Sequence, residues 1–419
     1  MKLDLTDTLY ALSFALDTVQ EEMGEISNHH GKNVAFLACI MGKYLKYNKE
    51  DLNDLVGLAI LHDNAYTEYV REEYFNGVFP DYETLKAKLM HTDDLRAGFL
   101  KAPKHCVVGE RNIKLIPFNS DVTNVILYHH ENADGSGPLG KKEDEVNEFA
   151  QIIHICDLMD VFFDLRAMSE YDFILAMKKM TSYSGTLFSE KMVKTLLNSL
   201  EFKDISYLQT FGAIAYLKEN VETEIKDYTD DQIENICLFF SKIVDYKSSV
   251  TKKHSLDVAL KCFEMASFYD FSEEKRIRFF FAGAMHDIGK LVISNEILEK
   301  PTTLTDEEMF IMMHHVDATN LILSGIKGID DITEWASNHH ERLDGSGYPR
   351  GLKAYELSFE DKLLQVIDVY VALREVRGYK PSLTHSDTID EMFKMVEKGL
   401  LDRDMVIDIN NVFIDDTDL

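Results

Sequence analysis

The sequence predicts an all-α protein made of two tandem helical bundles joined by a helical linker. Apolar residues recur at helical spacing over most of the 419 residues, as in LVGLAILHDNAYTEYV, and stretches that alternate as strands do are few. Proline, which interrupts helices, occurs only 7 times. The chain is too long for one typical domain, and the phrase HHENADGSGP at 129–138 returns at 339–349 as HHERLDGSGYP. We therefore expect two related helical domains.

The histidines and aspartates of the two halves repeat in register. The two HH pairs lie 210 residues apart, and other pairs keep the same or a similar offset. The matching pairs are His105 with His315 at 210, His30 with His254, His62 with His286 and Asp63 with Asp287 at 224, and Asp157 with Asp368 at 211. The repeat predicts homologous units at 1–205 and 229–419, with 206–228 as a helical linker.

Each unit carries a repeated set of five histidines and two aspartates, residue types that bind metals. Imidazole and carboxylate together suit iron, manganese or zinc, and a carboxylate that can bridge suits two ions about 3.5 to 4 Å apart. A single histidine beside an apolar run is usually a core or surface residue, but a set of seven that occurs twice is hard to attribute to chance. The candidate ligands of the second unit are His254, His286, Asp287, His315, His339, His340 and Asp368. The candidates of the first unit are His30, His62, Asp63, His105, His129, His130 and Asp157.

Positive side chains near the second set favour an anionic substrate. Lys290 follows Asp287 by three residues, so on a helix it shares the face of that aspartate and directs its ammonium toward the metals, where it suits a phosphate. The DGSG stretch requires positive φ and bends the chain, which would bring Tyr348 over the site as a rim. Further cations in this region are Arg342, Arg350, Lys353, Lys362, Arg374, Arg377 and Lys380.

The overall composition limits the partners. With a net charge of −29, the mean field would repel duplex DNA and anionic membranes, so an anionic ligand needs a local positive pocket. The N-terminal segment lacks a signal-peptide pattern, and no uncharged apolar run is long enough to span a membrane. Five cysteines stand singly in apolar runs without CxxC spacing, which is typical of reduced thiols in a core: Cys39, Cys106, Cys156, Cys237 and Cys262. We expect a cytoplasmic protein without a membrane or nucleic-acid duplex partner.

The motifs HDIGK at 286–290 and HHERLDGSGYP at 339–349 resemble the HD-GYP family, a branch of the HD-domain metal-dependent phosphohydrolases. The resemblance extends from about Thr251 to Tyr379, and a diverged version covers most of the first unit. It implies HD-type helical bundles with a centre of two or three metal ions, usually iron or manganese. It also implies hydrolysis of cyclic di-GMP, and in some members of cyclic GMP-AMP. By resemblance, the seven donors of the second unit are metal ligands, and Lys290 and Arg377 contact phosphate.

The second unit departs from the family pattern at three positions. Members with three metals carry a glutamate where this chain has Val250, so we expect two divalent ions. Val371 replaces the usual second aspartate of a DxxD stretch, a change that we expect to loosen metal affinity without removing a ligand. Gly378 replaces a proline and leaves the rim geometry open.

The first unit keeps its seven donors, but Tyr66 stands where Lys290 would be, and its DGSGP lacks the rim tyrosine. We expect no turnover there, and a regulatory or structural role with or without bound metal.

The leading hypothesis is a cyclic di-GMP phosphodiesterase that forms pGpG, GMP or both, with catalysis in the second unit through Asp287 and Lys290. Arg342, Tyr348, Arg374 and Arg377 are the other candidates for substrate contact. The alternatives are hydrolysis of cyclic GMP-AMP or another nucleotide, and a signalling receptor that binds nucleotide without turnover. A homodimer stays open.

Overall fold

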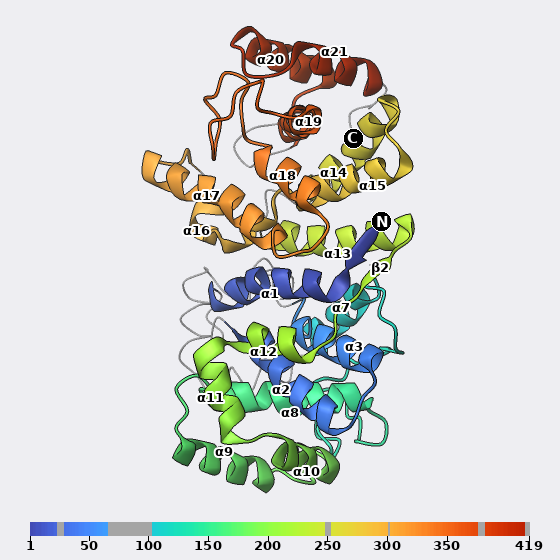
Figure 1. The fold of residues 1–419 in the computed structure, drawn as a ribbon, viewed down its shortest axis with the longest axis vertical. Coiled ribbons are helices and arrows are strands. Elements are labelled where there is room, and N and C mark those ends of the chain that lie inside the picture. Colours follow the sequence, from blue (N-terminus) through green and yellow to red (C-terminus); the bar gives the residue numbers. More distant parts are fainter. Residues whose placement is uncertain (23–28, 66–102, 248–252, 301, 376–381, 415–419) are drawn as a thin grey trace. The chain divides into compact units, whose positions relative to one another are not determined.

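The computed structural model confirms the all-α class. It describes residues 1–22, 29–65, 103–247, 253–300, 302–375 and 382–414. These residues form packed helices and one small two-stranded sheet, and they divide into two compact units, Asp4–Ile225 and Lys226–Leu419 together with Met1–Leu3 (Figure 1). Five residues named from the sequence lie outside the described residues: Val250, Tyr66, Arg377, Gly378 and Lys380.

The first unit is built around α2 (His30–Tyr44). The helix is buried from His30 to Gly42 because α3, α8 and α12 pack against it. Asn48 caps α3 by accepting a hydrogen bond from the Asp51 amide, and Ser169 caps α9 in the same way, so local sequence sets where these helices begin. The other helices of this unit are α1 (Leu5–Glu22), α3 (Lys49–Ile60), α7 (Pro103–Ile113), α8 (Glu148–Phe162), α9 (Glu170–Ser182), α10 (Glu190–Ser199), α11 (Phe202–Phe211) and α12 (Ala213–Asn220).

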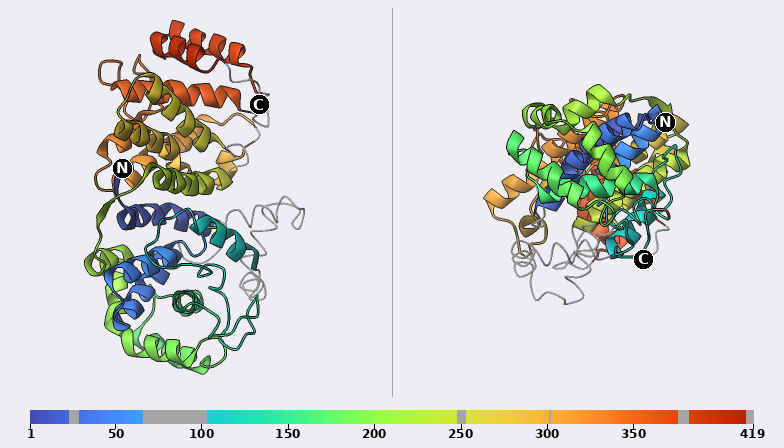
Figure 2. Two further views of the ribbon diagram at one scale, coloured as in Figure 1. Left: turned by 90° about the vertical axis from the view of Figure 1, so that its right-hand side faces the viewer. Right: turned by 90° about the horizontal axis from the view of Figure 1, so that it is seen from below.

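The second unit repeats this plan, with α14 (His254–Phe268) against α15 and α19 (Figure 2). Thr305 with Glu308 and Ser358 with Asp361 form capping boxes that start α17 and α19, the helices that carry two of the candidate ligands. The other elements are α13 (Asp230–Lys247), α15 (Glu273–Met285), the 3₁₀ helix η1 (Ile288–Val292), α16 (Asn295–Leu298), α17 (Asp306–Leu323), α18 (Asp330–Asn338), α19 (Phe359–Arg374), α20 (His385–Glu397) and α21 (Arg403–Val412).

Strands β1 (Lys2–Asp4) and β2 (Ile225–Asp227) pair where the chain passes between the units. The expected linker, 206–228, includes most of α11 and all of α12, and α12 packs on α2 inside the first unit. Contacts therefore place residues up to Ile225 with the first unit, and the domain boundaries stay a proposal. In the part of the chain that the structure describes, no helix combines the length and apolar character needed to cross a membrane.

Candidate metal centres

The seven candidate donors of the second unit come together from five helices. His254 begins α14, His286 follows the end of α15, His315 lies in α17, and Asp368 lies in α19. Asp287 follows His286, and the pair His339 and His340 follows α18. All are buried except His340, whose side chain is 22% exposed. The bundle thus brings together residues that are more than one hundred positions apart in sequence.

Asp287 lies between two groups of these donors. Its Oδ2 atom is 3.2 Å from Nε2 of His286 and 3.6 Å from Nε2 of His254. Its Oδ1 atom is 3.4 Å from Nε2 of His315 and 3.8 Å from Nε2 of His339. One carboxylate oxygen therefore faces each group, which is the arrangement needed to bridge two ions.

Asp368 and His340 complete the two groups. Asp368 Oδ1 is 3.1 Å from Nε2 of His254, and its Oδ2 is 3.9 Å from Nδ1 of His340. The neighbouring histidines outweigh burial and hold the pKa of Asp368 well below its usual range. Burial alone would raise this pKa. The carboxylate is ionised because positive or hydrogen-bonding imidazoles surround it.

Backbone carbonyls fix the orientation of three imidazoles. The Nδ1 atoms of His286, His315 and His339 donate to the carbonyls of the residues three positions earlier, at 2.7, 2.6 and 2.6 Å. Their Nε2 atoms, although buried, have no hydrogen-bond partner among the described residues. Burial, with the charge of nearby groups, lowers the pKa of His315 to about 4 and that of His339 to about 3, so both rings are neutral near pH 7. Neutral imidazoles with Nε2 lone pairs directed inward fit a metal centre.

Lys290 lies at the edge of the same cluster. After α15 the chain enters η1, and the Lys290 amide donates to the Asp287 carbonyl at 2.9 Å. Side chains three residues apart eclipse in a 3₁₀ helix, and the Lys290 ammonium contacts Asp287 Oδ2. The shared face expected for an α-helix thus arises from a 3₁₀ turn. Gly289 permits this turn, because a Cβ atom there would lie 1.9 Å from the His315 carbonyl oxygen of α17.

Glu341 holds the rim loop beside the histidine pair. Its carboxylate accepts the amides of Arg350 and Leu352, both at 2.8 Å, and Gly345 adopts the expected positive φ, +84°. The loop places the Tyr348 ring 4.8 Å from the His340 ring, centroid to centroid. Tyr348 therefore lies next to the donors.

The arginines that were candidates for substrate contact differ in position. Burial lowers the pKa of Arg342, and the opposing effect of the Asp368 charge is smaller. That opposing effect shows that the guanidinium is within electrostatic range of the cluster. Arg374, six residues beyond Asp368 on α19, donates to the Leu383 carbonyl at 3.3 Å. Of the two, Arg342 is the better placed to meet a substrate at the cluster.

The first unit assembles its seven donors in the same way. Asp63 Oδ2 is 3.3 Å from Nε2 of His62, and Asp63 Oδ1 is 3.7 Å from Nε2 of both His105 and His129. His30 Nε2 is 3.3 Å from Asp157 Oδ1. The Nε2 atoms of His30, His62 and His129 have no hydrogen-bond partner among the described residues. The first cluster therefore retains a donor set that could hold metal, although Tyr66 stands at the position of the lysine in the sequence.

Comparisons with known proteins agree with this duplicated geometry. Models of the HD domain match twice, at residues 29–161 and at 239–405. The chain belongs to the HD-domain family. It carries two HD domains in tandem, which confirms the resemblance drawn from HDIGK and HHERLDGSGYP.

Relatives named as cyclic dinucleotide phosphodiesterases match all or part of the chain. The 3'3'-cGAMP-specific phosphodiesterase 1 of Vibrio cholerae is 27% identical over 408 residues, which cover 95% of this chain and 89% of that protein. A cyclic di-GMP phosphodiesterase of Thermotoga maritima is 32% identical over 194 residues, 46% of this chain and 52% of that protein. The crystal structure of a cyclic GMP-AMP-specific phosphodiesterase of V. cholerae superposes with a TM-score of 0.63 at 21% identity, over 99% of this chain and 98% of that one. The structural likeness supports the fold.

The two HD domains orient their first histidine with different acids. In the first domain, Asp160 Oδ2 lies 2.7 Å from Nδ1 of His30. The matching position of the second domain is Val371, and there Glu375, one helical turn further on, places Oε1 2.9 Å from Nδ1 of His254. Glu375 therefore supplies an acid beside His254 where Val371 supplies none, and the expected loosening of metal affinity stays a prediction.

The first HD domain carries two donors that the sequence analysis did not assign. Cys106, expected to be a core thiol, is buried but belongs to a group with His105, His129 and His130. Burial raises the pKa of this thiol, but the neighbouring histidines lower it more, to about 6. His154 forms a further group with His130 and Asp157. The repeat offers a signal for both residues. The matching positions of the second domain are Val316 and Gln365, so the cysteine and the second-site histidine are donors found in the first domain alone of the pair.

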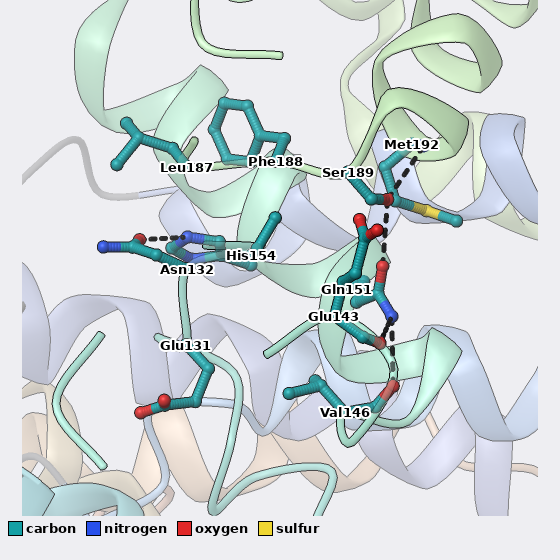
Figure 3. Close-up of a pocket in the computed structure, with 11 residues that line it drawn as sticks. Glu131, Asn132, Glu143, Val146, Gln151, His154, Leu187, Phe188, Ser189 and Met192 are labelled. Atoms are coloured by element: carbon teal, nitrogen blue, oxygen red, sulfur yellow. Dashed lines mark hydrogen bonds between the residues drawn. The ribbon is translucent and has the colours of Figure 1, made fainter. Parts of the chain in front are cut away.

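A pocket adjoins His154, which bonds to Asn132 at 3.2 Å and lies below Phe188 in Figure 3. Gln151 and Ser189 line its other side and are hydrogen-bonded to each other at 3.0 Å. The volume open to a water-sized sphere is only about 10 Å³, roughly the room that one water molecule needs. It is too small to enclose a cyclic dinucleotide.

Proposed function

We propose that the protein is a metal-dependent cyclic dinucleotide phosphodiesterase with its chemistry in the second HD domain. The observation that carries the proposal is the position of Asp287, with one oxygen toward His254 and His286 and the other toward His315 and His339. Two divalent ions held there, iron or manganese by family resemblance, would activate water and neutralise phosphate charge. His340 and Asp368 complete the proposed ligand set.

The remaining roles follow from the positions of the side chains. Lys290, 21% exposed and in contact with Asp287, can turn its ammonium to a non-bridging phosphate oxygen. Tyr348, beside His340, offers a ring face to a base, and Arg342 adds positive charge next to Asp368. Arg374 and Arg377 stay candidates for substrate contact from the sequence alone.

Among cyclic dinucleotides, we propose 3'3'-cyclic GMP-AMP as the preferred substrate. The sequence motifs alone favoured cyclic di-GMP. A relative that spans both HD domains is named as 3'3'-cGAMP-specific, whereas the Thermotoga maritima cyclic di-GMP enzyme matches over less than half of this chain. A relative that aligns over 95% of this chain is thus named for the mixed dinucleotide. Cyclic di-GMP is the second candidate.

We propose that the first HD domain performs no turnover. It retains seven donors, but the rim tyrosine is missing and Tyr66 occupies the position of the catalytic lysine. Its role would be structural or regulatory, and a receptor without any turnover is the alternative for the whole chain.

A substrate panel tests the proposal. The purified chain would be loaded with Mn²⁺ or, without oxygen, with Fe²⁺, and incubated with 3'3'-cGAMP, cyclic di-GMP and a linear dinucleotide. Chromatography would follow the linear products, pGpG and GMP among them. We expect both cyclic compounds to be opened, with 3'3'-cGAMP faster. Bound metal without any linear product would favour the receptor, and faster cyclic di-GMP hydrolysis would reverse the substrate order.

A further inference from the structure

One group of donors in the first HD domain has four metal-binding side chains where the second domain has three. Its ligand atoms all lie within 4.8 Å of one another, and all four residues are buried: His105, Cys106, His129 and His130. The matching group of the second domain is His315, His339 and His340, and Val316 stands at the position of Cys106. The difference adds a sulfur donor to one side of the first centre.

The distances suit a single tetrahedral ion. Cys106 Sγ is 3.4 Å from Nε2 of His105, which is 3.0 Å from Nε2 of His130. Donors bound to one zinc ion at about 2.0 to 2.3 Å lie roughly 3.3 to 3.8 Å apart at the corners of a tetrahedron. The 3.4 Å spacing lies within that range and the 3.0 Å spacing lies just below it. Small shifts would therefore bring these atoms to tetrahedral positions around one ion.

His129 gives independent evidence for a ligand. Its Nδ1 atom donates to the Ile126 carbonyl at 2.6 Å, so the ring is held with Nε2 facing the group. That nitrogen is fully buried and has no hydrogen-bond partner among the described residues. A buried acceptor without a donor is costly, and a metal ion would satisfy it.

We propose that His105, Cys106, His129 and His130 bind a zinc ion, with Cys106 as a thiolate ligand. Thiolate with imidazole suits zinc better than iron or manganese, which favour sites with more oxygen donors. Four protein ligands fill a tetrahedral shell, as in structural zinc sites, and a neighbouring carboxylate is that of Asp63, whose Oδ1 lies 3.7 Å from Nε2 of both His105 and His129. This ion stabilises the first HD domain, and the two domains of one chain hold different metals.

Cobalt substitution tests the sulfur ligand directly. The full chain is stripped with a chelator and reloaded with Co²⁺, whose thiolate complexes absorb in the near ultraviolet by sulfur-to-metal charge transfer. We expect this absorption in the wild type, its loss in Cys106→Val, which installs the residue of the second domain, and its retention in Cys39→Ala. Cys39 is a buried thiol of α2 outside the donor groups found among the described residues. In a chelator competition, Cys106→Val should bind zinc more than about tenfold less tightly, because losing even an outer-shell partner costs 10- to 100-fold.

The outcomes separate this proposal from the proposed hydrolysis, since neither readout measures turnover. Cobalt-loaded wild type without sulfur charge transfer would overturn it, as would a Cys106→Val spectrum equal to that of the wild type. If the valine variant does not fold, Cys106→Ser keeps the size of the side chain and should also lose the charge-transfer absorption. Retention of that absorption in the serine variant would equally contradict the assignment.

Discussion

Replacing Glu375 should weaken metal binding in the second HD domain, and an aspartate at position 371 should restore it. Glu375 Oε1 lies 2.9 Å from Nδ1 of His254, and this partly buried, charge-assisted contact orients the ring toward Asp368 and Asp287. Partners of this kind typically contribute 10- to 100-fold to metal affinity. In free energy, that is about 1.4 to 2.7 kcal/mol. We expect Glu375→Ala to lose affinity by this amount.

The first HD domain supplies the design of the rescue. There Asp160, at the position of Val371, lies 2.7 Å from Nδ1 of His30. The double variant Val371→Asp with Glu375→Ala transfers this contact to the second domain and should recover most of the lost affinity. Mn²⁺ affinity would be measured by calorimetric titration, with Glu397→Ala, an exposed acid of α20, as the control. Unchanged affinity in Glu375→Ala, or no recovery in the double variant, would refute the reasoning.

Three further predictions concern the second HD domain. Lys290→Met should lower kcat by roughly 100-fold or more, because one donor to a developing negative charge is lost. The metal content, measured by elemental analysis, should be unchanged, and loss of metal would contradict the role of Lys290 as a phosphate contact. The His254 ring donates hydrogen bonds to Asp368 and Glu375, which outweigh burial and raise the pKa of His254 to about 10, so below that pH a metal must displace a proton. Apparent Mn²⁺ affinity should therefore rise with pH between about 6 and 9, and calorimetry in buffers of different ionisation enthalpy should detect proton release. A flat profile would exclude the mechanism. Gly289→Ala would place a methyl group against the His315 carbonyl and should lower the free energy of unfolding by about 1 to 3 kcal/mol through overpacking. Denaturant unfolding would measure this change, and an unchanged free energy of unfolding would argue against the close contact of η1 and α17.

The sequence predicted the helical class and the duplication because both leave long-range periodic traces. The register of the histidines linked His105 with His315 and Asp157 with Asp368. Within each domain, the bundle brings the seven donors of that domain together. Residues outside that register were missed. Glu375 contacts His254 across 121 positions, and only the direction of its side chain at the end of α19 reveals the contact.

Cys106 was missed for a different reason. It follows His105 within the apolar run HCVV, where a thiol reads as a core residue. Neighbouring side chains on a helix diverge by about 100°, so the sequence alone does not predict that both reach one cluster. The packing of α7 against the turn that carries His129 decides it, and this packing depends on tertiary contacts.

The most direct test of the account compares the two aspartates that occupy the same place in the two HD domains. Cyclic dinucleotide hydrolysis would be measured for Asp287→Ala and Asp63→Ala, loaded with Mn²⁺ under identical conditions, with His286→Ala and His62→Ala as a second matched pair. The account predicts that Asp287→Ala abolishes product formation while Asp63→Ala retains most or part of it. Equal loss in both variants, or full activity in Asp287→Ala, would contradict a metal centre of the second domain as the seat of catalysis.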